Sequence, residues 1–215
     1  STTNVQIAGV DEADFVKNDG KYIYTISGEN VVIVDAFPAE SAQIVSTINL
    51  SGSNPHQLYV NRDRLVVFGN IYNYYTDPII IMPLLGETKA AESQAGSPPA
   101  EGMWPPRYSQ PTTYIKVYDV SDRSNPVIKK DIVLNGTYFN SRMIGDYVYA
   151  IVTTQPYYIG SDIIIPRFSP TQAAFPEVYY FPVPDFSYQF TNILSMNVFG
   201  DGEINNKVFL LGYSN

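Results

Sequence analysis

The chain has 215 residues, of which 45% are hydrophobic, 14% aromatic and 16% charged, and it contains no cysteine. This apolar content excludes a disordered chain, and the missing cysteine excludes disulfides and thiolate metal sites. Thirteen basic against 21 acidic residues leave a formal charge of −8, which excludes nucleic-acid binding through a basic surface.

Many Tyr, Phe and Pro residues, without long helical periodicity, predict an all-β fold. No apolar run is long enough to span a membrane; the strongest, Pro78–Leu85, is short and contains two prolines. Because the chain begins with Ser, we expect a mature or excised piece of a longer protein.

The first motif along the chain is Asp11-Glu12-Ala13-Asp14, which spells the DEAD signature of a helicase class. A nucleotide site would also need a phosphate-binding loop of the form G-x-x-x-x-G-K-[ST], and the sequence has none. The helicase interpretation is therefore excluded. The three carboxylates remain a candidate Ca²⁺ site, because hard cations prefer clustered oxygen ligands. The alternative is an acidic loop that is solvated or bonded to turn amides.

Three segments share one pattern, in which an apolar stretch, a tight polar turn and an alternating stretch follow one another: 15–27, 58–70 and 141–153. This pattern predicts three β-hairpins, with Tyr22 aligned with Leu65. Each hairpin is followed by two further alternating stretches. The repeat therefore predicts three four-stranded antiparallel blades in one domain over 1–215, with blade 1 at about 11–52, blade 2 at about 53–136 and blade 3 at about 137–215.

The opening Asn4–Tyr24 resembles the start of the secreted β-propeller-domain family of bacteria and archaea, distantly related to WD40 proteins. The run from Gly52 to Phe68 also looks like a YVTN-type repeat. The resemblance implies an extracytoplasmic propeller, secreted or at the cell surface, with no assigned activity and no cofactor. It also implies that the chain is an incomplete propeller, the N-terminal part of a longer one. Asp11, Glu12 and Asp14 would then lie at the channel rim, where blade 1 begins.

Blades 2 and 3 carry insertions at matching places, about 71–112 and 155–190, and both are rich in aromatic residues and proline. Connections of this length are unusual unless they have a function. Two interpretations stay open: the insertions pack on each other and cover one face, or they form a face that binds protein or glycan. The candidate ligand-binding residues are Trp104, Tyr108, Tyr157, Tyr158, Tyr179 and Tyr180.

Other candidate sites have weaker patterns. His56 is the only histidine, and no G-x-S-x-G motif accompanies it, so a catalytic triad has little support. Asn49 and Asn135 begin N-x-[ST] sequons, which fit a surface-exposed chain.

The sequence thus favours a non-catalytic module that binds or scaffolds protein or glycan partners. The alternative is a glycan- or peptide-active enzyme with its site at the channel mouth. Three blades would leave two outer faces open, which we expect to carry Val31, Ile33, Val117 and Val133. Because large apolar faces are rarely left bare, homo-oligomerisation through these faces is predicted.

Overall fold

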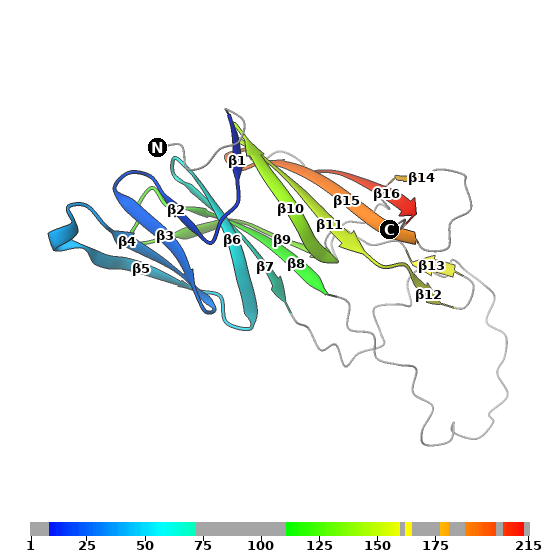
Figure 1. Cartoon of the computed structure of the whole chain (residues 1–215), viewed down its shortest axis with the longest axis horizontal. Coiled ribbons are helices and arrows are strands. Elements are labelled where there is room, and N and C mark those ends of the chain that lie inside the picture. Colours follow the sequence, from blue (N-terminus) through cyan, green and yellow to red (C-terminus); the bar gives the residue numbers. More distant parts are fainter. Residues whose placement is uncertain are drawn as a thin grey trace, which may run out of the picture. The chain divides into compact units, whose positions relative to one another are not determined.

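The computed structural model describes residues 9–71, 111–159, 162–164, 177–180, 188–200 and 204–212 (Figure 1). They all belong to one compact unit, Ser1–Tyr72 with Pro111–Asn215; a second unit, Asn73–Gln110, lies outside the described residues. Side chains of 157–159 and 162–164 are also outside the description. Within the described part, the only helix is η1 (Ala39–Ser41), and no helix is long and apolar enough to cross a membrane.

The strands form three main sheets in chain order. The first sheet contains β2 (Val16–Asn18), β3 (Tyr22–Ser27), β4 (Asn30–Asp35) and β5 (Gln43–Asn49). The second contains β6 (Ser53–Asn61), β7 (Arg64–Ile71), β8 (Thr112–Asp119) and β9 (Val127–Asn135). The third contains β10 (Thr137–Ile144), β11 (Tyr147–Thr154), β15 (Tyr188–Asn197) and β16 (Asn205–Gly212).

The third sheet has two additional strands at its edges, β1 (Val10–Glu12) beside β10 and β14 (Val178–Tyr180) beside β16. A separate two-stranded ribbon pairs β12 (Tyr157–Ile159) with β13 (Asp162–Ile164). The predicted all-β architecture of three antiparallel sheets is confirmed. One detail was wrong: β14 runs parallel to β16, because it comes from the inserted segment and not from a hairpin.

The pairing register shows which positions of the three sheets are equivalent. Tyr22 pairs with Asp35, Arg64 with Asp119, and Tyr147 with Asn197 at the same corner of each sheet. The predicted alignment of Tyr22 with Leu65 was therefore wrong by one residue. Because side chains alternate along a strand, a shift of one residue exchanges the two faces of a sheet. We call the face toward the following sheet the leading face, and the opposite one the trailing face.

The second sheet is buried on both faces. Leu65 and Val67 of β7 pack into a core shared with the first sheet, whereas Val66 and Phe68 pack into a core shared with the third. All four side chains are fully buried. Each contributes about 1.5–3 kcal/mol through removal of its apolar surface from water, so the alternating strand joins three sheets into one unit.

The predicted assignment of Val31, Ile33 and Val117 to open faces was wrong. Val31 and Ile33 point from the first sheet into the core shared with the second, and Val117 points toward the third. All three are fully buried, while Val133 is half-buried. The open faces therefore carry other residues.

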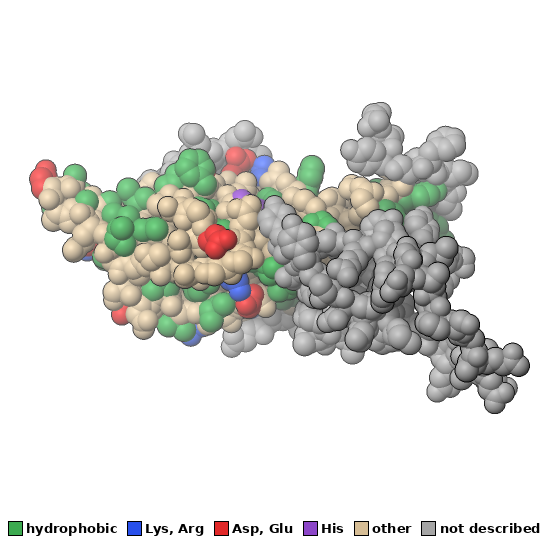
Figure 2. All heavy atoms as spheres, turned by 90° about the horizontal axis from the view of Figure 1, so that it is seen from below, with side chains coloured by type: hydrophobic (Ala, Val, Ile, Leu, Met, Phe, Trp, Pro, Cys, Tyr) green, Lys and Arg blue, Asp and Glu red, His purple; other side chains and the backbone are tan. Residues whose placement is uncertain are grey.

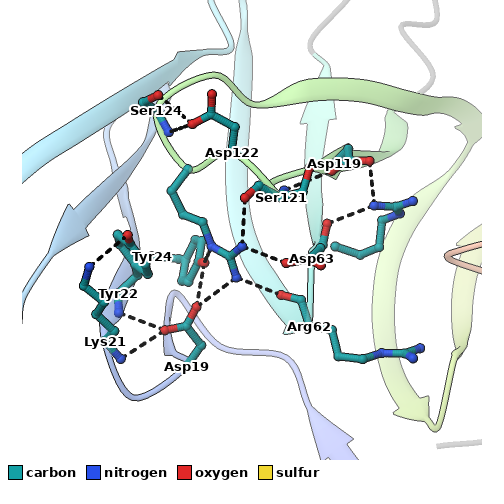
Figure 3. A network of polar contacts seen from close by, with 12 residues as sticks. Asp19, Lys21, Tyr22, Tyr24, Arg62, Asp63, Asp119, Ser121, Asp122 and Ser124 are labelled. Atoms are coloured by element: carbon teal, nitrogen blue, oxygen red, sulfur yellow. Dashed lines mark hydrogen bonds and ion pairs between the residues drawn. The ribbon is translucent and has the colours of Figure 1, made fainter.

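A network of polar contacts joins the first and second sheets (Figure 3). The guanidinium of Arg123, in the loop between β8 and β9, donates to Tyr24 Oη at 3.1 Å, Asp63 Oδ1 at 2.7 Å and Asp19 Oδ2 at 3.3 Å. The backbone carbonyl of Arg123 accepts a hydrogen bond from Ser46 at 2.7 Å. One loop of the second sheet thus holds both the turn and the outer strand of the first.

The turn between β9 and β10 holds the points where both insertions leave the sheets. Gly136 N–H donates to the carbonyl of Pro111 at 2.7 Å, and its own carbonyl accepts from Thr113 Oγ1 at 2.9 Å. Thr154, the last residue of β11, donates from Oγ1 to the carbonyl of Asn135 at 2.9 Å. Contact between segments 71–112 and 155–190 stays a prediction, since most of their residues lie outside the described ones.

The polar network predicts a loss of stability in acid. Burial alone would raise the pKa of Asp19, but hydrogen bonds from Tyr22, Lys21, Tyr24 and Arg123 lower it below the ordinary 3.8. The backbone N–H and hydroxyl of Ser121 lower the pKa of Asp119 to about 2. A carboxylate with a lowered pKa stabilises the fold above its unfolded value and stops doing so as pH falls. The free energy of unfolding should therefore fall between pH about 4 and about 2.

We expect Asp19→Asn to reduce that fall and to cost about 1.5 kcal/mol at pH 7, the low end for a charge-assisted hydrogen bond. Urea unfolding at several pH values measures both effects. Glu40→Gln, on the exposed η1, is the control and should keep the wild-type pH dependence. An unchanged acid dependence in Asp19→Asn would contradict the assignment.

The Gly136 turn predicts a position that tolerates no side chain. Gly136 has φ +127°, and a Cβ there would lie 2.7 Å from the carbonyl oxygen of Thr153. Gly136→Ala should therefore lower the free energy of unfolding by about 3 kcal/mol, from backbone strain and overlap together. Gly28→Ala is the control: its φ is +59° with open space around it, so it should cost only about 1 kcal/mol. Equal losses in chemical denaturation would show that overlap at Gly136 does not matter.

Candidate functional site

The segment Val10–Asn18, here called the linking segment, pairs with all three sheets in turn. Its first strand, β1, pairs with β10 of the third sheet, with Asp11 opposite Met143. Asp14 then forms two backbone hydrogen bonds with Leu58 of the second sheet, of 2.8 and 3.3 Å, before β2 pairs with β3 in the first. The predicted location of Asp11 and Glu12, at the start of the first blade, was therefore wrong; they lie on the inner edge of the third sheet.

Two of the three acidic residues of the linking segment, Asp11 and Glu12, form ion pairs with basic side chains of this chain. Lys17 Nζ lies 2.8 Å from Asp11 Oδ1 and donates to the carbonyl of Glu12 at 2.5 Å. The same ammonium lies 5.7 Å from the ring centroid of Tyr59, and the Lys17 side chain is only 7% exposed. Glu12 Oε1 lies 3.1 Å from the guanidinium of Arg142. A buried ammonium is tolerated here because a carboxylate, a carbonyl and an aromatic face surround it.

These contacts bear on the candidate Ca²⁺ site. Asp14 Oδ1 accepts from the backbone N–H of Phe15 at 2.7 Å, so this carboxylate acts as a turn acceptor. Among the described residues, no group of three or more His, Asp or Glu side chains lies close enough to hold a metal ion. The donor set fits internal ion pairs better than a Ca²⁺ shell, and calcium binding at these residues stays a prediction.

A cluster of hydroxyl groups joins the second and third sheets beside this segment. Ser141 Oγ lies 2.8 Å from Tyr59 Oη and 2.8 Å from Tyr138 Oη. Tyr138 also donates to the side chain of Gln57, and its ring centroid lies 4.9 Å from that of His56. Burial raises the pKa of both Tyr59 and Tyr138, and burial lowers the pKa of His56 although Asn70 partly offsets this.

The direction of these shifts decides what the cluster can do. At neutral pH both phenols keep their protons and His56 is uncharged, so the groups act as hydrogen-bond donors and acceptors between the sheets. A phenolate base would require the opposite shift. The cluster is suited to holding the two sheets in register, and the polar groups could also hydrogen-bond a neutral ligand.

The predicted ligand-binding aromatics fall into three groups. Trp104 and Tyr108 lie outside the described residues, and of Tyr157 and Tyr158 only the backbone, in β12, is described. Tyr179 and Tyr180 lie in β14 at the edge of the third sheet.

Contacts to the sheet hold β14 and its aromatic residues in place. The Tyr179 ring stacks on Phe209 of β16, with centroids 5.4 Å apart and an interplanar angle of 28°. Lys207 Nζ lies 5.3 Å from the Tyr179 ring centroid, and Tyr179 Oη donates to Glu177 Oε2 at 2.7 Å. The neighbouring Tyr180 is 67% exposed. The Tyr179 ring is therefore anchored, with an ammonium and a carboxylate in contact with it, while the ring of Tyr180 is presented to solvent.

The position of Tyr180 relates it to the Gly136 turn. Across the third sheet, Thr154 pairs with Phe190, Phe190 with Leu210 and Leu210 with Tyr180. Thr154 is the residue that bonds to the Gly136 turn. Tyr180 therefore lies in the same cross-strand row of the third sheet as Thr154, and the predicted binding face stays a prediction.

The inter-sheet polar contacts were missed at the sequence level, and one signal could have found some of them. Lys17, Tyr59 and Arg142 occupy equivalent positions, opposite Tyr24, Val66 and Tyr149. Two basic residues at an inner-strand position imply acidic partners nearby. Nothing local to Arg123 indicates that it reaches the first sheet.

Comparison with known proteins agrees with this architecture. The chain is 24% identical over 216 residues to an uncharacterised protein of Methanocaldococcus jannaschii, covering 99% of this chain and 26% of that protein. The chain thus spans about a quarter of this relative's length. No solved structure matches it. The beta propeller domain family matches residues 1–215. The three sheets described above are blades of a propeller, and the chain therefore belongs to the beta propeller domain family.

Proposed function

We propose that this chain is an extracytoplasmic propeller module, secreted or at the cell surface, that binds protein or glycan partners at the face carrying β14 and the Gly136 turn. The observation that carries the proposal is the geometry of β14. Tyr180 is largely exposed, and Tyr179 is fixed on Phe209 beside Lys207 and Glu177.

Each part of this arrangement suits recognition. A tyrosine ring offers a large contact area at low entropic cost, and its hydroxyl can hydrogen-bond a sugar or a peptide. The Tyr179 anchor restrains the strand before any ligand arrives, which lowers the cost of binding. The flanking ammonium and carboxylate supply polar contacts that a carbohydrate hydroxyl or a backbone amide could use.

The carboxylates at the inner strands of this chain are paired with basic side chains, which favours binding over catalysis there. An enzyme at the channel mouth would need carboxylates available to a substrate, as in glycoside hydrolysis. Asp11 and Glu12 instead contact Lys17 and Arg142. This supports a binding or scaffolding module, which would also associate with further copies through open sheet faces.

The test is binding of the purified chain to an array of defined oligosaccharides and to immobilised cell-surface proteins. We expect Tyr180→Ala to weaken the selected interaction roughly tenfold, as for an exposed aromatic anchor of an interface. Because Tyr180 is 67% exposed, its truncation should leave thermal unfolding unchanged. Isothermal titration with the selected oligosaccharide or protein measures the change.

Phe37→Ala is the matched control, because Phe37 is an equally exposed aromatic, at 69%, in the loop between β4 and β5. It should bind like the wild type. Loss of binding in Phe37→Ala, or wild-type binding in Tyr180→Ala, would contradict the proposal.

A further inference from the structure

The side chain of His56, the only histidine of the chain, joins the second sheet to the third. His56 is the unpaired residue of a β-bulge between β6 and β7. A bulge directs a side chain out of the regular alternation of its strand. Here the imidazole centroid lies 4.9 Å from the ring centroid of Tyr138 in the third sheet. The imidazole is also hydrogen-bonded to the side chain of Asn70 in β7.

The contact with Tyr138 belongs to the packing of the two sheets. Tyr138 lies on the trailing face of the third sheet, against the core that the second and third sheets share. Its ring centroid lies 5.2 Å from that of Phe68, on the leading face of the second sheet. The Tyr138 hydroxyl is engaged by Gln57 and Ser141. His56 therefore extends an aromatic cluster that holds two sheets together.

The contact with Asn70 leads to the place where both insertions leave the sheets. Asn70 is the last residue but one of β7, and its Oδ1 lies 3.4 Å from Thr113 Oγ1. The same hydroxyl donates to the carbonyl of Gly136 at 2.9 Å, and Gly136 N–H donates to the carbonyl of Pro111 at 2.7 Å. A path of polar contacts thus runs from the imidazole to the Gly136 turn.

A charged imidazole does not suit this environment. Both nitrogens of an imidazolium donate, whereas a neutral ring has one donor and one acceptor. Tyr138 and Asn70, which contact the ring, are both uncharged at neutral pH, and the carboxylate of Asp14 in the linking segment accepts from the N–H of Phe15. Charged groups on the surrounding strands form ion pairs elsewhere: Asp11 with Lys17, Glu12 with Arg142, Arg64 with Asp119 and Lys116 with Asp131. Burial accordingly lowers the pKa of His56, although the hydrogen bond to Asn70 partly offsets this.

We propose that His56 is an acid-sensitive latch for the turn that holds both insertions. While the imidazole is neutral, its contacts with Tyr138 and Asn70 keep the second and third sheets closed around Gly136. The ring is half-buried, and the histidine is visible at the surface in Figure 2 (purple), so a small rotation brings a protonated ring into water. In mild acid this rotation loosens the contact between Gly136 and Pro111. That the face proposed to bind protein or glycan then changes its affinity with pH rests on the proposed function.

The sign of the pH dependence follows from the burial of the ring. The unfolded chain takes up the proton near pH 6.5, the ordinary pKa of histidine, whereas the folded chain takes it up only at lower pH. The stability that neutral His56 contributes is therefore complete above pH 6.5 and is lost as pH falls below this value. Asp19 and Asp119 act at lower pH, since their pKa values lie below 3.8. The two effects are therefore separable.

NMR of the 215-residue chain tests the latch without any ligand. The single imidazole signal should titrate with a midpoint below 6.5. Between about pH 7 and about pH 5, the Gly136 amide should lose protection against hydrogen exchange roughly tenfold, the equivalent of a shift of one pKa unit. The Val120 amide is the internal control, because it donates to the carbonyl of Asp63 at the other end of β8 and should keep its protection.

His56→Gln keeps a hydrogen-bonding side chain that does not titrate, and it should abolish the loss at Gly136. Lys129→Gln, on the exposed side of β9, is the matched control and should respond like the wild type. A titration midpoint at or above 6.5, equal losses at Gly136 and Val120, or an unchanged loss in His56→Gln would each overturn the proposal. The first two outcomes are measured on the wild type, so they decide the matter even if His56→Gln fails to fold.

This proposal and the proposed function fail separately. Tyr180→Ala should weaken ligand binding and keep the pH response of the Gly136 amide. His56→Gln should keep ligand binding at neutral pH and lose that response.

Discussion

Burial of one sheet on both faces is the constraint on which the rest of this structure depends. Leu65, Val66, Val67 and Phe68 form an uninterrupted apolar run in β7, and their side chains enter two different cores in alternation. A strand of this kind cannot be stable at the surface, because either exposed face would place two large apolar side chains in water. The first and third sheets are therefore required neighbours of the second.

Polar contacts then determine how these neighbours are oriented. Apolar packing alone is not directional, whereas the Arg123 guanidinium must reach acceptors at fixed angles. The Tyr59 and Ser141 hydroxyls act similarly between the second and third sheets. Both sets of contacts lie between residues far apart in sequence, so they select one arrangement of sheets that local strand preferences would leave undetermined.

The sequence was sufficient to predict the kind of fold, but not which side chains point to which face of each sheet. Three hairpin patterns predicted three sheets because turns and alternation are local properties. The alignment of Asn18 with Asn61 joined two identical residues, yet the register makes Asn18 equivalent to Val60. The expectation that Val31 lies on an open face was a separate error, since Val31 packs in the core shared by the first and second sheets. The contacts of Arg123 could not be predicted either, because they join parts of the chain that only the folded arrangement brings together.

The linking segment has a consequence for how the protein is made. Val10–Glu12 leave the ribosome more than a hundred residues before their strand partner, Arg142–Ile144. Contacts of such long range form slowly, because the chain between them must first be ordered. During synthesis the inner edge of the nascent chain therefore stays unpaired until the third hairpin has emerged. The first two sheets can pack on each other before then, but Asp11 receives its strand partner only when the third hairpin folds.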